Sequence, residues 1–82
     1  MSYFAVIYRY CDDAAKLEQN RPAHRAWLGQ MFDQGRLKLA GPLTGAAPRA
    51  GLLLVEATDL AEAEAMVDQD PVCRDGLVAS RD

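Results

Sequence analysis

The 82-residue sequence predicts an α+β fold in which an antiparallel four-stranded sheet carries two helices on one face. Three observations support this prediction. Residues 2–10 alternate between two faces as a strand does, residues 51–57 form an almost continuous apolar run, and residues 24–32 and 63–67 repeat apolar side chains at helical spacing. The segments follow one another as strand, helix, strand, strand, helix, strand, which is the split βαβ or ferredoxin-like order.

The first long helix contains a proline, Pro22, close to its expected start. Proline lacks a backbone N–H and is tolerated in the first helical turn, so we expect this helix to begin at Asn20 or Arg21. Gly35 is expected to end it. Residues 14–18 are then expected to form only a separate, short helical turn.

The remaining strands are predicted from alternation and from apolar runs. Residues 36–40 alternate polar and apolar side chains, and Gly41-Pro42 is expected to end that strand because proline cannot continue a hydrogen-bonded ladder. A Gly- and Pro-rich loop over residues 43–50 leads to a buried central strand over residues 51–57. A short closing strand is expected over residues 76–80.

The second helix is expected to open at Thr58 or Asp59, because Asp59 and Glu62 have the spacing of a capping box. Pro71 disfavours helical geometry in the residue before it, so the helix should end at about Asp70. This places the Asp70 carboxylate at the negative end of the helix dipole, which is unfavourable for an anion that has no partner.

His24 is the only histidine of the chain, and it begins an apolar stripe. The residues that follow it at i+3, i+4, i+7 and i+8 are Trp27, Leu28, Met31 and Phe32. A position in the first turn of a helix disfavours the charged imidazolium, and a neutral imidazole is what a general base requires. A hydrogen-bonded core histidine would produce the same pattern.

The predicted topology brings His24 and Asp70 to one edge of the sheet, although they lie in opposite halves of the chain. Tyr10 and the Gly41-Pro42 stretch reach the same edge. Two polar residues that interrupt apolar stripes and then converge favour a functional site. A histidine–aspartate hydrogen bond that only ties the helix ends together is the alternative.

Length, composition and charge predict a single domain and indicate which partners to expect. At this length we expect a single domain over residues 1–82. Nine Lys and Arg residues against twelve Asp and Glu residues give a net charge of −3, and the basic residues are scattered, so nucleic acid is not an expected partner. There is no signal-type or spanning apolar segment and no metal-binding spacing, so we expect a cytoplasmic protein without a membrane anchor, metal or other cofactor.

A homodimer is expected, because two amphipathic helices cover only one face of a sheet whose strands 2–10 and 51–57 are apolar on both faces. The contact should use either Leu53 with Val55 or the alternating pair Leu52 and Leu54.

Four short motifs resemble those of the YCII-related proteins. They are Arg21-Pro22-Ala23-His24, Gly35-Arg36-Leu37, Gly41-Pro42 and Asp70-Pro71, and their order and spacing extend over nearly the whole chain. The resemblance implies a dimeric α+β barrel made of two ferredoxin-like sheets. It also implies an active-site dyad at His24 and Asp70. Some relatives act on small ring compounds, including a dehydrochlorinase of chlorinated hydroxyquinones.

We therefore expect a cofactor-independent lyase or isomerase for a small, cyclic organic substrate, with His24 as general acid/base and Asp70 orienting it. The expected substrate-binding residues are Tyr8, Tyr10, Arg21, Gly41 and Pro42. A non-catalytic small-molecule-binding or regulatory dimer is the first alternative, because fold does not decide function. A structural subunit of a larger assembly is the second.

Overall fold

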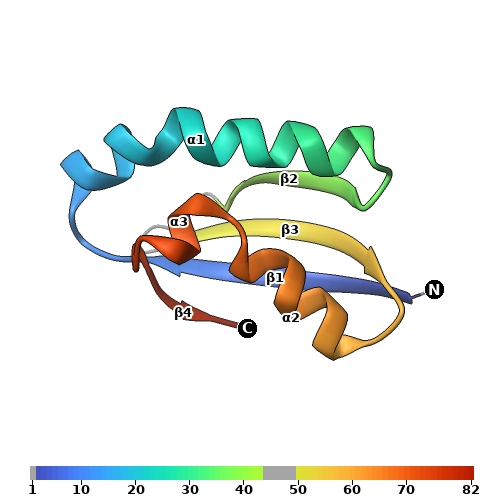
Figure 1. Cartoon of the computed structure of the whole chain (residues 1–82). Coiled ribbons are helices and arrows are strands. Elements are labelled where there is room, and N and C mark those ends of the chain that lie inside the picture. The colour runs from blue at the N-terminus through green and yellow to red at the C-terminus, as the bar shows by residue number, and fades with distance from the viewer. Residues whose placement is uncertain (1, 44–49) are drawn as a thin grey trace.

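The computed structural model describes residues 2–43 and 50–82 (Figure 1). The elements are β1 (Ser2–Tyr10), α1 (Ala14–Asp33), β2 (Leu37–Leu43), β3 (Ala50–Ala57), α2 (Leu60–Asp68), α3 (Pro71–Arg74) and β4 (Val78–Arg81). The strands form one antiparallel sheet in the order β2-β3-β1-β4. This confirms the predicted α+β, ferredoxin-like fold. Most of the loop predicted over residues 43–50 lies outside the described residues.

The core lies between the helices and one face of the sheet. Alternation along the strands directs Val6 and Tyr8 of β1 and Leu53 and Val55 of β3 into it, and all four side chains are buried. The helices contribute Trp27, Met31, Ala63, Met66, Val67 and Val72.

The opposite face of the sheet, which we call the outer face, is also apolar. The register pairs Ile7 with Leu52 and pairs Leu54 with both Ala5 and Leu39, so these side chains share that face. Leu39 is 46% exposed. Of the two pairs that the sequence left open for a dimer contact, the one on the outer face is therefore Leu52 and Leu54.

The predicted start of the long helix at Asn20 or Arg21 is wrong. Helix α1 begins at Ala14, where the Asp13 side chain accepts a hydrogen bond of 3.1 Å from the Lys16 backbone N–H, and it continues through Pro22. Proline inside a helix removes one backbone hydrogen bond, but Leu17 packs against the core and gives the first turns tertiary contacts that offset this loss. His24 therefore lies in the middle of α1, and the expected effect of the helix dipole on its charge does not apply.

The predicted end of the second strand is also wrong. Strand β2 continues through Gly41-Pro42 to Leu43, and Pro42 pairs with Gly51. Because β2 is the edge strand of the sheet, a missing N–H can face away from the ladder without breaking it.

Asp70 does not end the second helix. Helix α2 is capped by Asp59 and stops at Asp68, and Asp70 instead caps the short helix α3, where its side chain accepts a hydrogen bond from the Val72 backbone N–H. A carboxylate is stabilised at a helix N-terminus, so its local position is favourable, contrary to the prediction. Gly76 adopts a φ of 72°, which turns the chain and delays β4 to Val78.

Two glycines, one within α1 and one just after it, allow a test of this local structure. Gly29 lies within the helix, whereas Gly35 follows it with a φ of 73° and completes a Schellman motif, in which Arg36 N–H bonds to Met31 O at 2.9 Å and Gly35 N–H to Phe32 O at 3.0 Å. At neither glycine would an added Cβ come within 4 Å of a neighbouring group.

We expect Gly29→Ala to raise the free energy of unfolding by about 0.5–1 kcal/mol, because alanine loses less backbone entropy in a helix. Gly35→Ala should lower it by about 1–2 kcal/mol, because the left-handed conformation is strained for alanine. Thermal melts of both variants provide the test. The same sign for both would contradict the described end of α1.

Candidate active site

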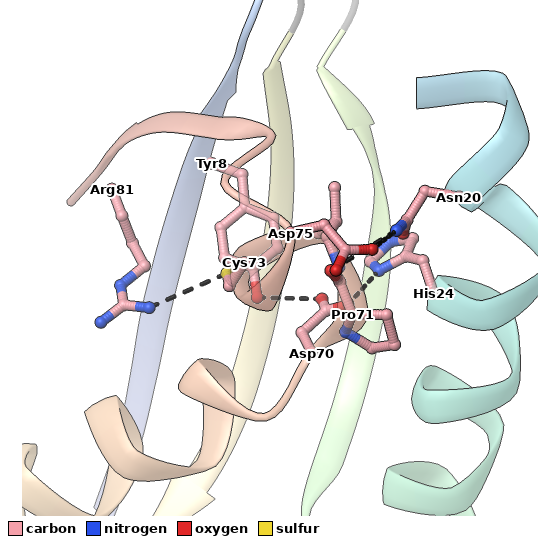
Figure 2. A network of polar contacts seen from close by, with 9 residues as sticks. Tyr8, Asn20, His24, Asp70, Pro71, Cys73, Asp75 and Arg81 are labelled. Carbon is pink, nitrogen blue, oxygen red and sulfur yellow. Dashed lines mark hydrogen bonds and ion pairs between the residues drawn. The ribbon is translucent and has the colours of Figure 1, made fainter. Parts of the chain in front are cut away.

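The site is built around Asp70, whose side chain is completely buried (Figure 2). Its Oδ1 lies 2.7 Å from His24 Nδ1 and accepts a second hydrogen bond of 3.2 Å from the Val72 backbone N–H. Its Oδ2 accepts a hydrogen bond of 3.0 Å from the Tyr8 hydroxyl. Each oxygen therefore has a partner, which offsets the cost of removing a carboxylate from water.

His24 reaches Asp70 from the middle of α1, and its side chain is 18% exposed. When the carboxylate is ionised it can only accept hydrogen bonds, so the hydrogen of a neutral imidazole lies on Nδ1. The second ring nitrogen, Nε2, is then the one that can take up or release a proton. The arrangement provides an imidazole whose orientation is fixed on one side and whose reactive nitrogen is on the other.

Tyr8 lies behind Asp70 rather than in contact with solvent. Its side chain is completely buried, so the structure does not place it where it was predicted, in direct contact with a substrate. Burial raises the pKa of the Tyr8 hydroxyl far above its ordinary value, and the nearby Asp70 carboxylate raises it further. The hydroxyl therefore remains protonated and donates to Asp70.

A pocket of about 610 Å³ opens beside His24, between α1 and the ends of β2 and β3; we call it the His24 pocket. This volume is within the range of small-molecule sites. Its polar side chains are Asn20, Arg21, His24, Arg25 and Tyr10, and its apolar walls include Leu17, Leu28, Leu53, Pro42 and Val72. Of the residues predicted for the site, Tyr10, Arg21, Gly41 and Pro42 line the pocket together with His24, whereas Tyr8 and Asp70 do not.

Tyr10 occupies its position because residue 51 is a glycine. A Cβ atom at Gly51 would lie 2.9 Å from the Tyr10 hydroxyl oxygen, too close for any real contact. The Tyr10 ring also meets the Tyr8 ring edge to face, with centroids 5.9 Å apart. Burial raises the pKa of Tyr10 to about 12, with a further contribution from the Asp70 carboxylate. Tyr10 therefore offers a protonated hydroxyl to the pocket at neutral pH.

A second polar link joins α1 to α3, one helical turn before His24. The Asn20 Nδ2 donates to Asp75 Oδ2 at 2.6 Å and to the Pro71 carbonyl at 3.4 Å. The Asn20 Oδ1 is buried and has no hydrogen-bond partner among the described residues. Neither Asn20 nor Arg25 was predicted as a site residue, and Asn20 was missed because the helix was expected to begin at Asn20 or Arg21. With α1 correctly begun, the i, i+4 spacing of Asn20 and His24 would have identified the first of them.

Cys73 lies on the other side of Tyr8. Burial raises the pKa of its thiol, although the neighbouring Arg81 guanidinium acts in the opposite direction. The Arg81 guanidinium lies 3.8 Å from the sulfur and forms an ion pair of 2.7 Å with Asp68. A thiol with a raised pKa is a weak nucleophile, so this cluster is better suited to holding β4 than to covalent chemistry.

Two kinds of feature are absent from the described residues. In residues 2–43 and 50–82, no three or more His, Cys, Asp or Glu side chains gather closely enough to hold a metal ion. None of the described helices has the length and apolar character needed to cross a lipid bilayer.

Comparison with known proteins adds two findings. No curated protein matches the chain at a significant level. Among solved structures, the chain is similar to 5-chloro-2-hydroxyhydroquinone dehydrochlorinase from Burkholderia phenoliruptrix AC1100, in complex with 2,5-dihydroxybenzoquinone. The match has 24% identity and a TM-score of 0.77, and it covers 99% of this chain and 89% of the other. At this identity the likeness establishes the fold alone.

The family is established by the sequence itself. A family model described as the YCII-related domain matches residues 1–82, which is the full length of the chain. The protein therefore belongs to the YCII-related domain family.

Proposed function

We propose that this protein is a cofactor-independent lyase or isomerase that moves a proton on a small, cyclic organic substrate, with His24 as general acid/base. The observation that carries the proposal is the contact of 2.7 Å between His24 and the buried Asp70, beside an open pocket. A general base needs a fixed orientation and an accessible nitrogen, and His24 combines both. The cytoplasmic location expected from the sequence stays a prediction.

In this proposal Asp70 positions the imidazole and stabilises the imidazolium that forms when Nε2 accepts a proton. Tyr8 in turn holds Asp70, so it acts through its partner rather than on the substrate. Proton transfer by a placed side chain contributes about 10²–10⁴ in rate, so the substrate should already carry an acidic C–H or O–H group. Tyr10 and Arg21, which line the pocket, would contact the substrate.

The name of the structural neighbour supports the proposed class of substrate. That enzyme is named as a dehydrochlorinase of a chlorinated hydroxyhydroquinone and was solved with a quinone bound. Removing hydrogen chloride from such a ring requires one proton acceptor and the departure of chloride with its bonding electrons. His24 is the residue of this chain that could accept the proton.

Asp70 also caps α3, and this favours a competing interpretation in which the histidine–aspartate contact only ties α1 to α3. The pocket could then bind a small molecule without transforming it. A substitution at residue 24 that keeps the hydrogen bond to Asp70 but cannot transfer a proton separates catalysis from binding alone.

We also propose that two copies pair through their outer faces, as the family resemblance implies. Three large apolar side chains on or beside this face, those of Tyr3, Leu39 and Leu43, are at least 37% exposed, and a second copy could remove this apolar surface from water. Pairing would cover them and close two sheets into a barrel.

The central test is His24→Asn, because the asparagine side-chain NH2 can still donate to Asp70 but has no nitrogen that titrates. We expect this variant to fold with nearly unchanged stability, and we expect its turnover rate to be lower by a factor of about 10²–10⁴. The assay follows chloride release from 5-chloro-2-hydroxyhydroquinone, with thermal melts in parallel. Retained turnover in His24→Asn would contradict the proposal.

A second test needs no substrate. His24 is the only histidine, so nitrogen NMR of the imidazole reports this site alone. We expect the neutral ring to carry its hydrogen on Nδ1, and we expect Asp70→Asn to weaken that preference because it removes the charge that selects it. A neutral ring with its hydrogen on Nε2 would contradict the described contact.

The tyrosines predict how stability depends on pH. The pKa of Tyr10 is raised to about 12 in the folded protein, and that of Tyr8 is raised further. A raised pKa stabilises the fold below the unfolded value of about 10, and this stability is lost as the pH rises through the folded value. We expect the free energy of unfolding in urea to fall above about pH 10. Tyr10→Phe should make the decline shallower, because it removes one of the two groups whose pKa is raised.

The proposed dimer predicts the effect of a charge on the outer face. We expect Leu54→Glu to give a monomer in sedimentation experiments, because pairing would bury two carboxylates without partners. Leu60→Glu is the matched control, since Leu60 begins α2 and is 59% exposed away from the sheet. A monomeric mass for the unmodified protein at micromolar concentration would contradict the dimer.

A further inference from the structure

The charges of the His24 pocket differ in sign from those of the chain as a whole. The chain carries a net charge of −3, yet the charged side chains among the described pocket residues are Arg21 and Arg25, and none of the described lining residues is Asp or Glu. Asp70 lies behind His24 and is completely buried. A concave site lined by one sign of charge attracts molecules of the opposite sign.

The two arginines differ in how strongly they are engaged by other residues. Arg21 forms an ion pair of 3.3 Å with Glu18, but both side chains are at least half exposed, so water screens this pair. Arg25 pairs with no carboxylate of the described residues. It is therefore the guanidinium most available to an acidic group in the pocket.

Asn20 is one of the residues that line the same pocket, and it carries a polar atom without a partner. Its Oδ1 is buried and receives no hydrogen bond from the described residues, while its Nδ2 is held by Asp75 and Pro71. Because both neighbours of Nδ2 are acceptors, exchanging the two amide atoms would lose two hydrogen bonds and cannot remove the deficit. A buried acceptor without a donor costs free energy, and a ligand hydroxyl group could supply that donor.

We propose that the His24 pocket binds a small, planar organic anion, with its acidic group held by Arg25, assisted by Arg21, and with a hydroxyl group donating to Asn20 Oδ1. The apolar walls, which include Leu28, Leu53 and Val72, would contact the ring. This inference names the substrate class of the proposed function and rests on that function for its site. It does not require that any reaction occur.

The test uses three probes titrated into isotope-labelled protein and followed by NMR. They are 3-hydroxybenzoate, which has both groups, 3-hydroxybenzamide, which lacks the charge, and benzoate, which lacks the hydroxyl. We expect the acid to bind about tenfold more tightly than the amide and about three- to tenfold more tightly than benzoate. Added salt should weaken binding of the acid and leave the amide little changed.

Arg25→Gln should remove most of the preference for the acid over the amide. Arg74→Gln is the control, because it removes the same charge from an exposed position that does not line the pocket. Equal binding of acid and amide, an unchanged preference in Arg25→Gln, or no saturable binding of any probe at millimolar concentration would each overturn the proposal. Equal binding of 3-hydroxybenzoate and benzoate would overturn the role of Asn20.

His24→Asn separates this inference from the proposed function. The variant should keep the preference for the acid, because neither arginine nor Asn20 is changed. Charge preference without turnover of any substrate would remove the catalytic proposal and leave the anion site intact. Turnover of a neutral substrate, together with equal binding of the acid and the amide, would remove the anion site and leave the catalytic proposal intact.

Discussion

The burial of one carboxylate organises this small domain. Asp70 has no exposed surface, and an isolated charge in that position would destabilise the fold by several kcal/mol. Its oxygens are satisfied by groups from three elements: a hydroxyl of β1, an imidazole of α1 and a backbone N–H of α3. Because β1 and α1 lie far from Asp70 in the sequence, the carboxylate can be fully satisfied only when sheet, long helix and short helix have all assembled. The contact therefore connects the polar site to the cooperative fold.

The polar contacts between α1 and α3 explain why α1 can tolerate its proline. Two side chains one turn apart, Asn20 and His24, bond to α3, and they lie on either side of Pro22. Both sides of the interrupted turn are thereby tied to the rest of the molecule. A helix attached only by its C-terminal half would be free to end at the proline, as the sequence suggested. Tertiary contacts override local preference here.

Local patterns predicted the fold well, but they did not predict the site for the right reason. Alternation in residues 2–10 correctly directed Tyr8 and Tyr10 to one face, and the meeting of His24 with Asp70 follows from the topology. The Asp59 cap of the second helix and the stop of the first at Gly35 were predicted correctly. The start of the first helix was wrong because Asp13 caps a helix that continues through Pro22, and the end of the second was placed too late because Asp70 caps a further helix that periodicity could not reveal. The sequence also could not predict how deeply the Tyr8 side chain is buried. Whether Tyr8 touches a ligand or supports Asp70 depends on which helix covers it, and that is a tertiary property.

A single imidazole limits the chemistry that the proposed function can include. If Asp70 keeps the Nδ1 hydrogen in place, every proton that His24 handles must pass through Nε2. The nitrogen that removes a proton then carries it until it is returned to the substrate, to a leaving group or to water. This suits an isomerisation, in which one proton is returned, or an elimination, in which a leaving anion departs.

Reactions that need a second side chain titrating near neutral pH fit less well, because burial keeps the Tyr10 hydroxyl, which lines the pocket, protonated. Tyr10 would then serve as a hydrogen-bond donor that stabilises negative charge on a substrate oxygen while His24 moves the proton.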